Sequence, residues 1–174
     1  MTTAQLFEVT AADVALTTDD WYTPRWIFDA AGLVFDMDVC APVAPEFRTC
    51  PARRYLTVVE DGLTSEWHGT IWCNPPYSKA AQWAPRWIKH PSGLALVLGK
   101  SKVGWLGPFL AASDAVAFLS VEFGRPDGST ADLTWPLILV AKGSKCVAAL
   151  ARVAAADKYA AGAYHVRPNR AGGS

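Results

Sequence analysis

The sequence has little charge, and the charge it has is balanced. Sixteen lysines and arginines offset sixteen aspartates and glutamates, so the formal net charge is zero and only 18% of residues are charged. Domains dedicated to nucleic-acid binding are usually basic, so this balance argues against tight, non-specific DNA binding. It still allows an enzyme that touches DNA briefly through a local basic face. Since 51% of residues are hydrophobic, we expect a compact globular protein and not a disordered chain.

Paired cysteines and long apolar runs are also missing. The four cysteines, at positions 40, 50, 73 and 146, include no Cys-x-x-Cys pair, so we expect free thiols and no metal site. The first twenty residues contain acidic residues but no basic one, which is unlike a signal peptide. No apolar run is long enough to span a membrane. These absences predict a cytoplasmic protein.

The 174 residues suit one domain, 1–174. Residues 1–19 are expected to be an irregular leader, and residues from about 162 to 174 a flexible tail. Strands are predicted at 33–39, 54–59, 70–73, 93–98, 115–123 and 133–140, and helices at 79–90, 105–112 and 145–156. The alternation predicts an α/β fold with a compact Rossmann-like sheet, mostly parallel, that ends in an antiparallel hairpin.

Two helix starts carry local signals. Thr23 is expected to cap a first helix, with Pro24 at its first helical position and Gly32 at its end. Ser78 is expected to cap the helix over 79–90.

Polar residues follow two of the predicted strands, where ligands gather in parallel sheets. Asp38 ends the strand over 33–39, and Asn74 directly follows the strand over 70–73. We therefore expect both to face one cleft. Asp36 and Asp38 point the same way on an alternating strand, so either is a candidate ligand, and we favour Asp38 because it is nearer the strand end. A carboxylate there can accept hydrogen bonds from ribose hydroxyls or an ammonium group.

The run Asn74, Pro75, Pro76 and Tyr77 suits the methylation of an exocyclic amine on an aromatic base. Such an amine is a poor nucleophile, so its hydrogens must be held and its lone pair aligned with a sulfonium methyl group. The Asn74 side-chain carbonyl and the Pro75 backbone carbonyl can accept those hydrogens, and the two prolines stiffen the loop. The Tyr77 ring can stack the base, which is worth about 1–3 kcal/mol.

The same run also fits a simple turn, because two prolines end a strand in any protein. Its context favours the catalytic interpretation. An apolar strand leads in, a helix follows, and acidic positions precede it.

Several motifs together carry a family resemblance. In chain order they are Trp21-Tyr22-Thr23-Pro24, Asp38-Val39-Cys40-Ala41, Cys50, Tyr55-Leu56-Thr57, Asp61-Gly62-Leu63, Trp67, Asn74-Pro75-Pro76-Tyr77-Ser78 and Trp83. In order and spacing, over roughly residues 20–142, the chain resembles the bacteriophage DNA N6-adenine methyltransferases (the Dam-like phage family). The proline motif alone also occurs in protein-glutamine methyltransferases, whereas the whole set in this order is much more specific.

The resemblance implies S-adenosylmethionine as methyl donor, S-adenosylhomocysteine as product, adenine in DNA as acceptor, and no metal. It implies a host-cytoplasm location if the protein is phage-encoded. The donor-binding residues that it implies are Thr23, Pro24, Asp38, Cys40, Ala41 and Asp61, with Asp61 contacting donor or target adenine.

Contacts to DNA are predicted for a few polar residues near the strand ends: Ser78, Lys79, Lys100, Lys102 and Arg125. For the lysines a solvated loop is the simple alternative, and for Arg125 a plain hairpin turn. Gly99-Lys100-Ser101 is not a nucleotide-binding loop, because Leu94 stands where that motif needs glycine.

Two other functions stay open at this point. The acceptor can be an RNA base or a protein glutamine, which the zero net charge makes harder to dismiss. The chain can also be a binding module that kept the fold and lost the donor, because no Gly-x-Gly follows Asp38.

Overall fold

A computed structural model covers the chain and describes residues 19, 21–100, 102–125, 128–132, 135–160 and 162–166. The strands are β1 (Phe35–Asp38), β2 (Ala52–Tyr55), β3 (Ile71–Cys73), β4 (Gly93–Leu98), β5 (Ala115–Leu119), β6 (Glu122–Gly124), β7 (Thr130–Asp132), β8 (Leu137–Lys142) and β9 (Ala163–His165). The α-helices are α1 (Arg25–Ala31), α2 (Ala80–Lys89), α3 (Leu106–Ala111) and α4 (Ser144–Ala156), and the 3-10 turns are η2 (Pro45–Phe47) and η3 (Tyr77–Lys79).

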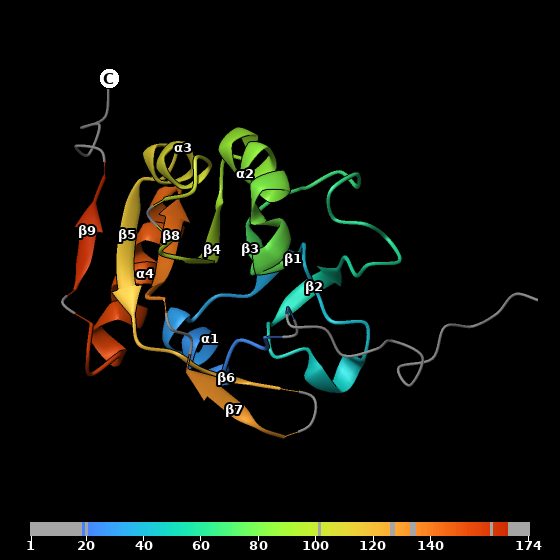
Figure 1. Ribbon diagram of the computed structural model, residues 1–174, viewed down its shortest axis with the longest axis horizontal. Coiled ribbons are helices and arrows are strands. Elements are labelled where there is room, and N and C mark those ends of the chain that lie inside the picture. The colour runs from blue at the N-terminus through green and yellow to red at the C-terminus, as the bar shows by residue number, and fades with distance from the viewer. Residues whose placement is uncertain are drawn as a thin grey trace, which may run out of the picture.

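The described residues form a mixed α/β structure around a seven-stranded sheet in the order β2-β1-β3-β4-β8-β5-β9 (Figure 1). The first four strands are parallel. The other half is antiparallel, because β8 lies between β4 and β5 and runs opposite to both, and β9 runs opposite to β5. The prediction of a mostly parallel sheet therefore holds for one half. The chain returns from β5 to β8 without a crossover helix, and such a return makes an antiparallel pair.

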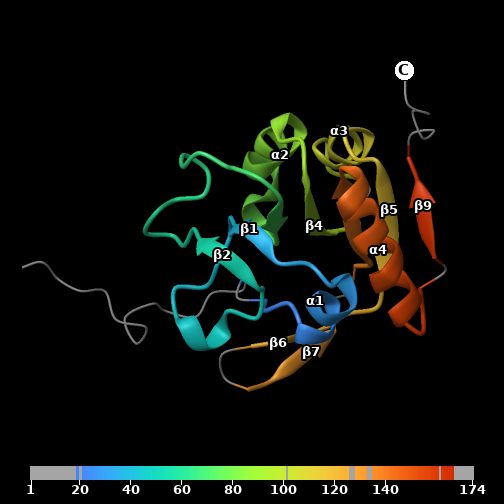
Figure 2. The ribbon, with the colours of Figure 1, turned by 180° about the vertical axis from the view of Figure 1, so that it is seen from behind.

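Helices cover both faces of the sheet. α1 and α4 pack on one face, against a core that includes Trp72 and Leu139 (Figure 2). α2 and α3 pack on the other, where Trp87 and Phe109 stack with ring centroids 5.2 Å apart. This two-sided burial explains why β4 is apolar along its whole length.

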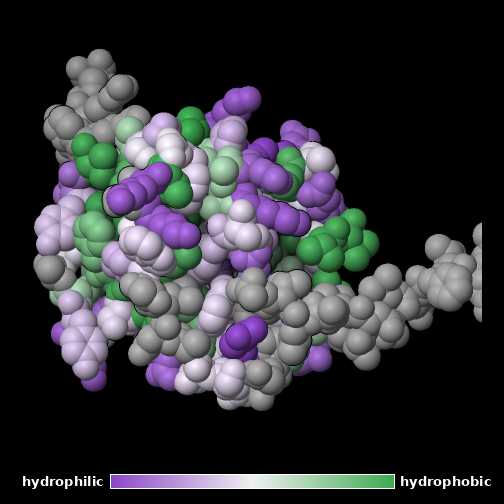
Figure 3. All heavy atoms as spheres, viewed as in Figure 1, coloured by the Kyte–Doolittle hydropathy of each residue, from purple (hydrophilic) through white to green (hydrophobic). Residues whose placement is uncertain are grey.

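The ribbon of β6 and β7 lies beyond the carboxyl end of β5, at the bottom of Figure 1. On the face seen in Figure 3, hydrophobic side chains are scattered among hydrophilic ones. Within the described residues, no helix has the length and hydrophobicity needed to cross a membrane.

Several predicted boundaries change. β4 matches its prediction, and Gly32 ends α1 in a left-handed conformation with φ 58°. The two predicted caps are wrong: α1 and α2 begin after Pro24 and Lys79, and neither start has a side-chain cap. β9 pairs with β5 inside the stretch that was expected to be a tail. The predicted leader lies outside the described residues apart from Asp19.

Candidate active site

The turns that follow β1 and β3 lie side by side at one edge of the sheet. Asp38 is in register with Trp72, and the Val39 N–H donates to the Trp72 carbonyl over 3.0 Å. Just beyond, the Cys40 and Cys73 sulfurs are 3.6 Å apart. Since β2 follows on the other side of β1, the strand order reverses between β1 and β3. Open α/β sheets bind ligands at such a reversal.

The turn after β1 contains no glycine, but a glycine from another loop packs against it. A Cβ on Gly62 would lie 2.0 Å from the Val39 carbonyl oxygen and 2.8 Å from the Trp83 ring. Only glycine therefore allows these backbones to approach so closely. The Ala41 N–H donates to the Leu56 carbonyl over 2.9 Å, which ties the turn to the chain after β2.

Asp38 is a buried carboxyl at the end of β1, with 4% of its surface exposed. Its Oδ1 accepts the Cys40 N–H over 3.1 Å. Burial raises the pKa of Asp38 from 3.8 to about 7, and the Cys40 N–H and the charge of Arg48 lower it less. A carboxylate has about four acceptor positions. Asp38 therefore keeps capacity to bind a ligand's hydroxyl or ammonium hydrogens, which are its natural partners in a buried site.

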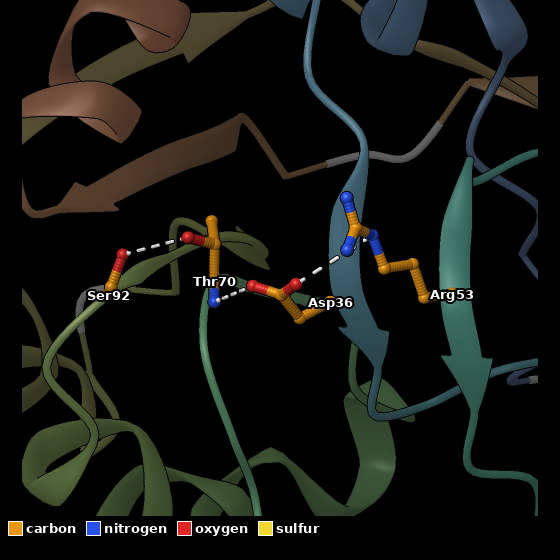
Figure 4. Close-up of polar contacts among 4 residues, drawn as sticks. All are labelled: Asp36, Arg53, Thr70 and Ser92. Atoms are coloured by element: carbon orange, nitrogen blue, oxygen red, sulfur yellow. Dashed lines mark hydrogen bonds and ion pairs between the residues drawn. The ribbon is translucent and has the colours of Figure 1, made fainter.

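Asp36 is engaged in a structural role at the other end of β1 (Figure 4). Its Oδ2 accepts the Thr70 N–H over 2.8 Å, and its Oδ1 lies 3.9 Å from the Arg53 Nε. A Cβ on Gly69 would lie 2.2 Å from the same Oδ2, so the carboxylate is packed tightly against that turn. The two aspartates therefore differ. Asp36 holds the backbone just before β3, whereas Asp38 lies at the carboxyl end of β1.

The amide of Asn74 has a fixed direction. Its Nδ2 donates to the Trp21 carbonyl over 2.9 Å and to the Thr23 hydroxyl over 3.3 Å. A carbonyl can only accept, so the nitrogen must face Trp21. The Asn74 Oδ1 is buried and has no hydrogen-bond partner in the described part of the chain. A buried acceptor left unpaired costs about 1–3 kcal/mol, which marks this oxygen as one that awaits a donor.

The two prolines have different backbone surroundings. The Pro76 carbonyl accepts the Lys79 N–H over 2.9 Å and so holds η3. The buried Pro75 carbonyl has no such partner among the described residues. The Pro75 carbonyl is therefore the second hydrogen-bond acceptor of the Asn74–Tyr77 loop that remains available to a ligand.

Tyr77 lies at the edge of the core, with its ring edge-on to Phe123 at 6.3 Å. Its hydroxyl is buried without a partner in the described residues. Burial raises the pKa of Tyr77 well above its ordinary value, so the ring stays neutral.

Residues 21–24, which we call the strap, cross this edge of the sheet before α1. The Tyr22 N–H donates to the Gly124 carbonyl over 3.1 Å, and the Thr49 hydroxyl donates to the Thr23 carbonyl over 2.7 Å. The Trp21 ring lies 6.0 Å from Phe123. The sequence predicts Thr23 as a helix cap and donor-loop residue but gives no sign of its contact with Asn74. The Trp21 contribution comes from a backbone carbonyl, which has no sequence signature.

A pocket of about 300 Å³ opens beside Tyr77. Its lining residues come from η3, α2, the end of β4 and the start of α3: Tyr77, Ser78, Ala80, Ala81, Leu98, Lys100, Val103 and Trp105. Trp105 is held edge-on to Phe109 at 5.7 Å. Apolar walls with a few polar groups are typical of small-molecule sites. Leu98, Val103 and Trp105 were not expected from the sequence, because the walls form only when α3 packs beside α2.

The remaining predicted residues are spread more widely. Asp61 is exposed at φ 53°, and its carboxylate accepts the Leu63 N–H over 3.0 Å and the Thr64 hydroxyl over 3.1 Å, so it holds its own turn. The Ser78 N–H and hydroxyl both bind the Asp19 carboxylate. Among the described residues, neither Asp61 nor Ser78 forms a hydrogen bond to the Asn74 oxygen, and their predicted ligand contacts stay predictions.

The basic candidates differ in exposure. Lys79, Lys100 and Lys102 are exposed, with the Lys100 ammonium 5.8 Å from the Trp135 ring. Arg125 instead turns toward the strap, with its guanidinium 5.0 Å from the Trp21 ring. Among the described residues, no three histidine, cysteine or acidic side chains are grouped to hold a metal ion.

A comparison with protein families gives a match over residues 12–120, to the family described as DNA N-6-adenine-methyltransferase (Dam). The match covers more than half of the chain, including the strap, the turn after β1 and the Asn74–Tyr77 loop. Neither the curated proteins nor the solved structures gave a match.

Proposed function

The chain belongs to the DNA N-6-adenine-methyltransferase (Dam) family, and from this we propose that the edge of the sheet around Asn74 carries the methyl transfer. As a member, it is an enzyme that transfers a methyl group from S-adenosylmethionine to the N6 of adenine in DNA. Neither the comparisons nor the described residues support an RNA or glutamine acceptor, or an inactive binding module. A bacteriophage origin is a proposal that depends on the sequence resemblance alone, and a cytoplasmic location is a proposal that depends on sequence pattern and resemblance.

We propose that the parallel half of the sheet is Rossmann-like in architecture. The order β2-β1-β3-β4 is the order found at the start of doubly wound sheets, whose ligands bind at the reversal between the first and third strands. Asp38 and Asn74 follow the two strands at this reversal. The placement of the reactive residues is thus the one that the topology favours.

Two acceptors hold the target amine in this proposal: the Asn74 Oδ1 and the Pro75 carbonyl. The observation that carries the assignment is the buried, unpaired Asn74 oxygen. An amine with two hydrogens fits two open acceptors, and holding both hydrogens directs the nitrogen lone pair away from them. The strap and the proline pair fix these acceptors before substrate arrives, which reduces the reorganisation needed at reaction. The amine proton is lost after transfer, so no strong base is required.

We assign the binding site of the methyl donor to the turn after β1. S-adenosylmethionine supplies the methyl group and leaves as S-adenosylhomocysteine. The residues present fit it, because Asp38 is a buried carboxyl with unused acceptor capacity toward hydroxyl or ammonium hydrogens. Cys40 and Ala41 provide the adjoining backbone, and Thr23 and Pro24 border it from the strap. Burial raises the pKa of Cys40, so its thiol stays neutral beside a cationic donor.

The base is proposed to enter the pocket between Tyr77 and Trp105. Both residues line it, and aromatic side chains stack nucleobases without regard to sequence. A base must leave the duplex to reach such a pocket. Lys100 at the pocket, with Lys79 and Lys102 exposed nearby in the chain, is proposed to contact phosphates.

Replacing Asn74 by alanine tests the catalytic assignment. Asn74→Ala removes the preorganised acceptor, so we expect methyl transfer to fall by about 10³-fold or more, with an unchanged circular dichroism spectrum. Incorporation of tritiated methyl groups into DNA, with mass spectrometry for N6-methyladenine, measures the effect. Gln82→Ala is the matched control, because it deletes an exposed amide from α2. Activity of the Asn74 variant within a few-fold of the wild type would contradict the assignment.

A further inference from the structure

We infer that Thr23 is a positioning residue: the Trp21 carbonyl sets which way the Asn74 amide points, and the Thr23 hydroxyl holds the amide there as the second acceptor for its Nδ2 hydrogens. The inference rests on the proposed role of Asn74 as acceptor for the target amine. The strap would then contribute to the reaction as well as to the packing of the protein.

The amide geometry carries the inference. A side-chain amide has two ends of almost equal shape, one accepting and one donating. The Asn74 Nδ2 has two acceptors, at 2.9 Å on Trp21 and 3.3 Å on Thr23. If the amide turned over, its oxygen would face the Trp21 carbonyl at hydrogen-bond distance, with no hydrogen between two acceptors. The strap therefore keeps the oxygen on the substrate side.

Thr23 itself has little freedom to move. Only 4% of its surface is exposed, so water does not readily replace its hydroxyl. Its carbonyl accepts the Thr49 hydroxyl over 2.7 Å, and the neighbouring Tyr22 N–H binds the Gly124 carbonyl over 3.1 Å. Contacts from two distant segments thus fix the oxygen that receives the Asn74 hydrogen.

The same contacts make the site selective for asparagine at position 74. Aspartate would offer an equivalent oxygen to the substrate amine. Its second oxygen would replace Nδ2 and meet the Trp21 carbonyl, from which it can accept nothing. An ionised aspartate would therefore be repelled by the strap, although it suits the amine.

The first experiment compares Thr23→Val with Thr23→Ser in the full-length enzyme. Valine keeps the shape and removes the acceptor, so we expect kcat to fall about tenfold, in line with the loss of one hydrogen bond. The KM for DNA should stay within about twofold. Serine keeps the hydroxyl and should restore kcat. Thr49→Val measures the effect of loosening the strap alone, because it removes the bond to the Thr23 carbonyl without touching the amide. Its fall in kcat should be clearly smaller than that of Thr23→Val.

The outcomes separate this inference from the proposed function. Loss of activity in Asn74→Ala together with full activity in Thr23→Val would overturn the positioning role and leave the catalytic assignment standing. Equal losses in Thr23→Val, Thr23→Ser and Thr49→Val would show a general loosening of the strap and would also overturn it. Full activity in Asn74→Ala would contradict the proposed catalytic role of Asn74, on which the inference rests. Asn74→Asp should be at least about tenfold slower than wild type, and wild-type kcat in that variant would contradict the asparagine selectivity.

Discussion

The parallel and antiparallel halves of the sheet use their polar residues differently. In the parallel half, Asp38 ends β1 and Asn74 directly follows β3, and acceptor capacity remains open on both. In the antiparallel half, the Asp114 carboxylate accepts the Gly143 N–H over 2.8 Å, and the Asp157 carboxylate accepts the Ser120 N–H over 2.7 Å. These two carboxylates hold the backbone, as Asp36 does in the first half, whereas Asp38 and Asn74 keep acceptors for a ligand.

Strand direction explains the difference. Parallel strands bring their carboxyl ends to one edge, so residues that follow β1, β3 and β4 gather in one place. Antiparallel strands place consecutive ends at opposite edges, and short connections use the polar groups there. The polar residues Asp38 and Asn74 therefore lie at the shared edge where parallel strands end, whereas Asp114 precedes β5 and Asp157 follows α4.

Leu139→Ala should give the largest effect on stability and none on the chemistry. Leu139 is fully buried in β8, in register with Leu96 and Ala117. Truncation leaves a cavity, so the free energy of unfolding should fall by about 2–5 kcal/mol. Urea denaturation measures this, and kcat per folded molecule should remain unchanged. A large fall in kcat for the fully folded variant would show that the antiparallel half also contributes to catalysis.

Asp38→Asn should remove the pH dependence of donor binding. With a pKa of about 7, the wild-type carboxyl is mostly ionised at about pH 8 and mostly protonated at about pH 6, so donor Kd should rise about tenfold across that range. Titration calorimetry at several pH values measures it. The asparagine variant should bind weakly with a flat profile, and a flat wild-type profile would contradict the assignment.

The stability contribution of Asp38 runs in the opposite direction to donor binding. Because burial raises its pKa above the ordinary 3.8, the folded state favours the protonated carboxyl. That stability is fully present below about pH 4 and is lost as pH rises to about 7. Asp38→Asn should therefore be more stable than the wild type at neutral pH, which the same urea experiment detects.

Asp36→Asn should give the smallest effect and serves as the partner control for Asp38. It weakens the bond to the Thr70 N–H and the contact with Arg53, so we expect a loss of about 1 kcal/mol in stability. Donor affinity and its pH profile should match the wild type. If instead Asp36→Asn weakens donor binding and Asp38→Asn does not, the two aspartates have been assigned the wrong way round.

The sequence predicted features that depend on local pattern. The apolar run of β4, the stop at Gly32 and the α/β class follow from periodicity and residue type. The caps at Thr23 and Ser78 were wrong because both side chains bind distant partners, Asn74 and Asp19, that outcompete the local helix. Long-range contacts of this kind leave no local signal.

The same limit applies to the site. The catalytic role of the Asn74–Tyr77 loop could be proposed from the sequence because the acceptors and the ring that it needs lie in four adjacent residues. The direction of the Asn74 amide depends on a backbone carbonyl 53 residues away. The insertion of β8 between β4 and β5 depends likewise on pairing partners far along the chain.

The strap also has a consequence for the order in which the molecule assembles. Its contacts join Trp21 to Asn74, Thr23 to Thr49 and Tyr22 to Gly124, so the amide gains its direction only when early and late parts of the chain have met. Contacts between distant segments form slowly, because a long loop must close first. The direction of the Asn74 amide therefore depends on segments far apart in the sequence being packed together.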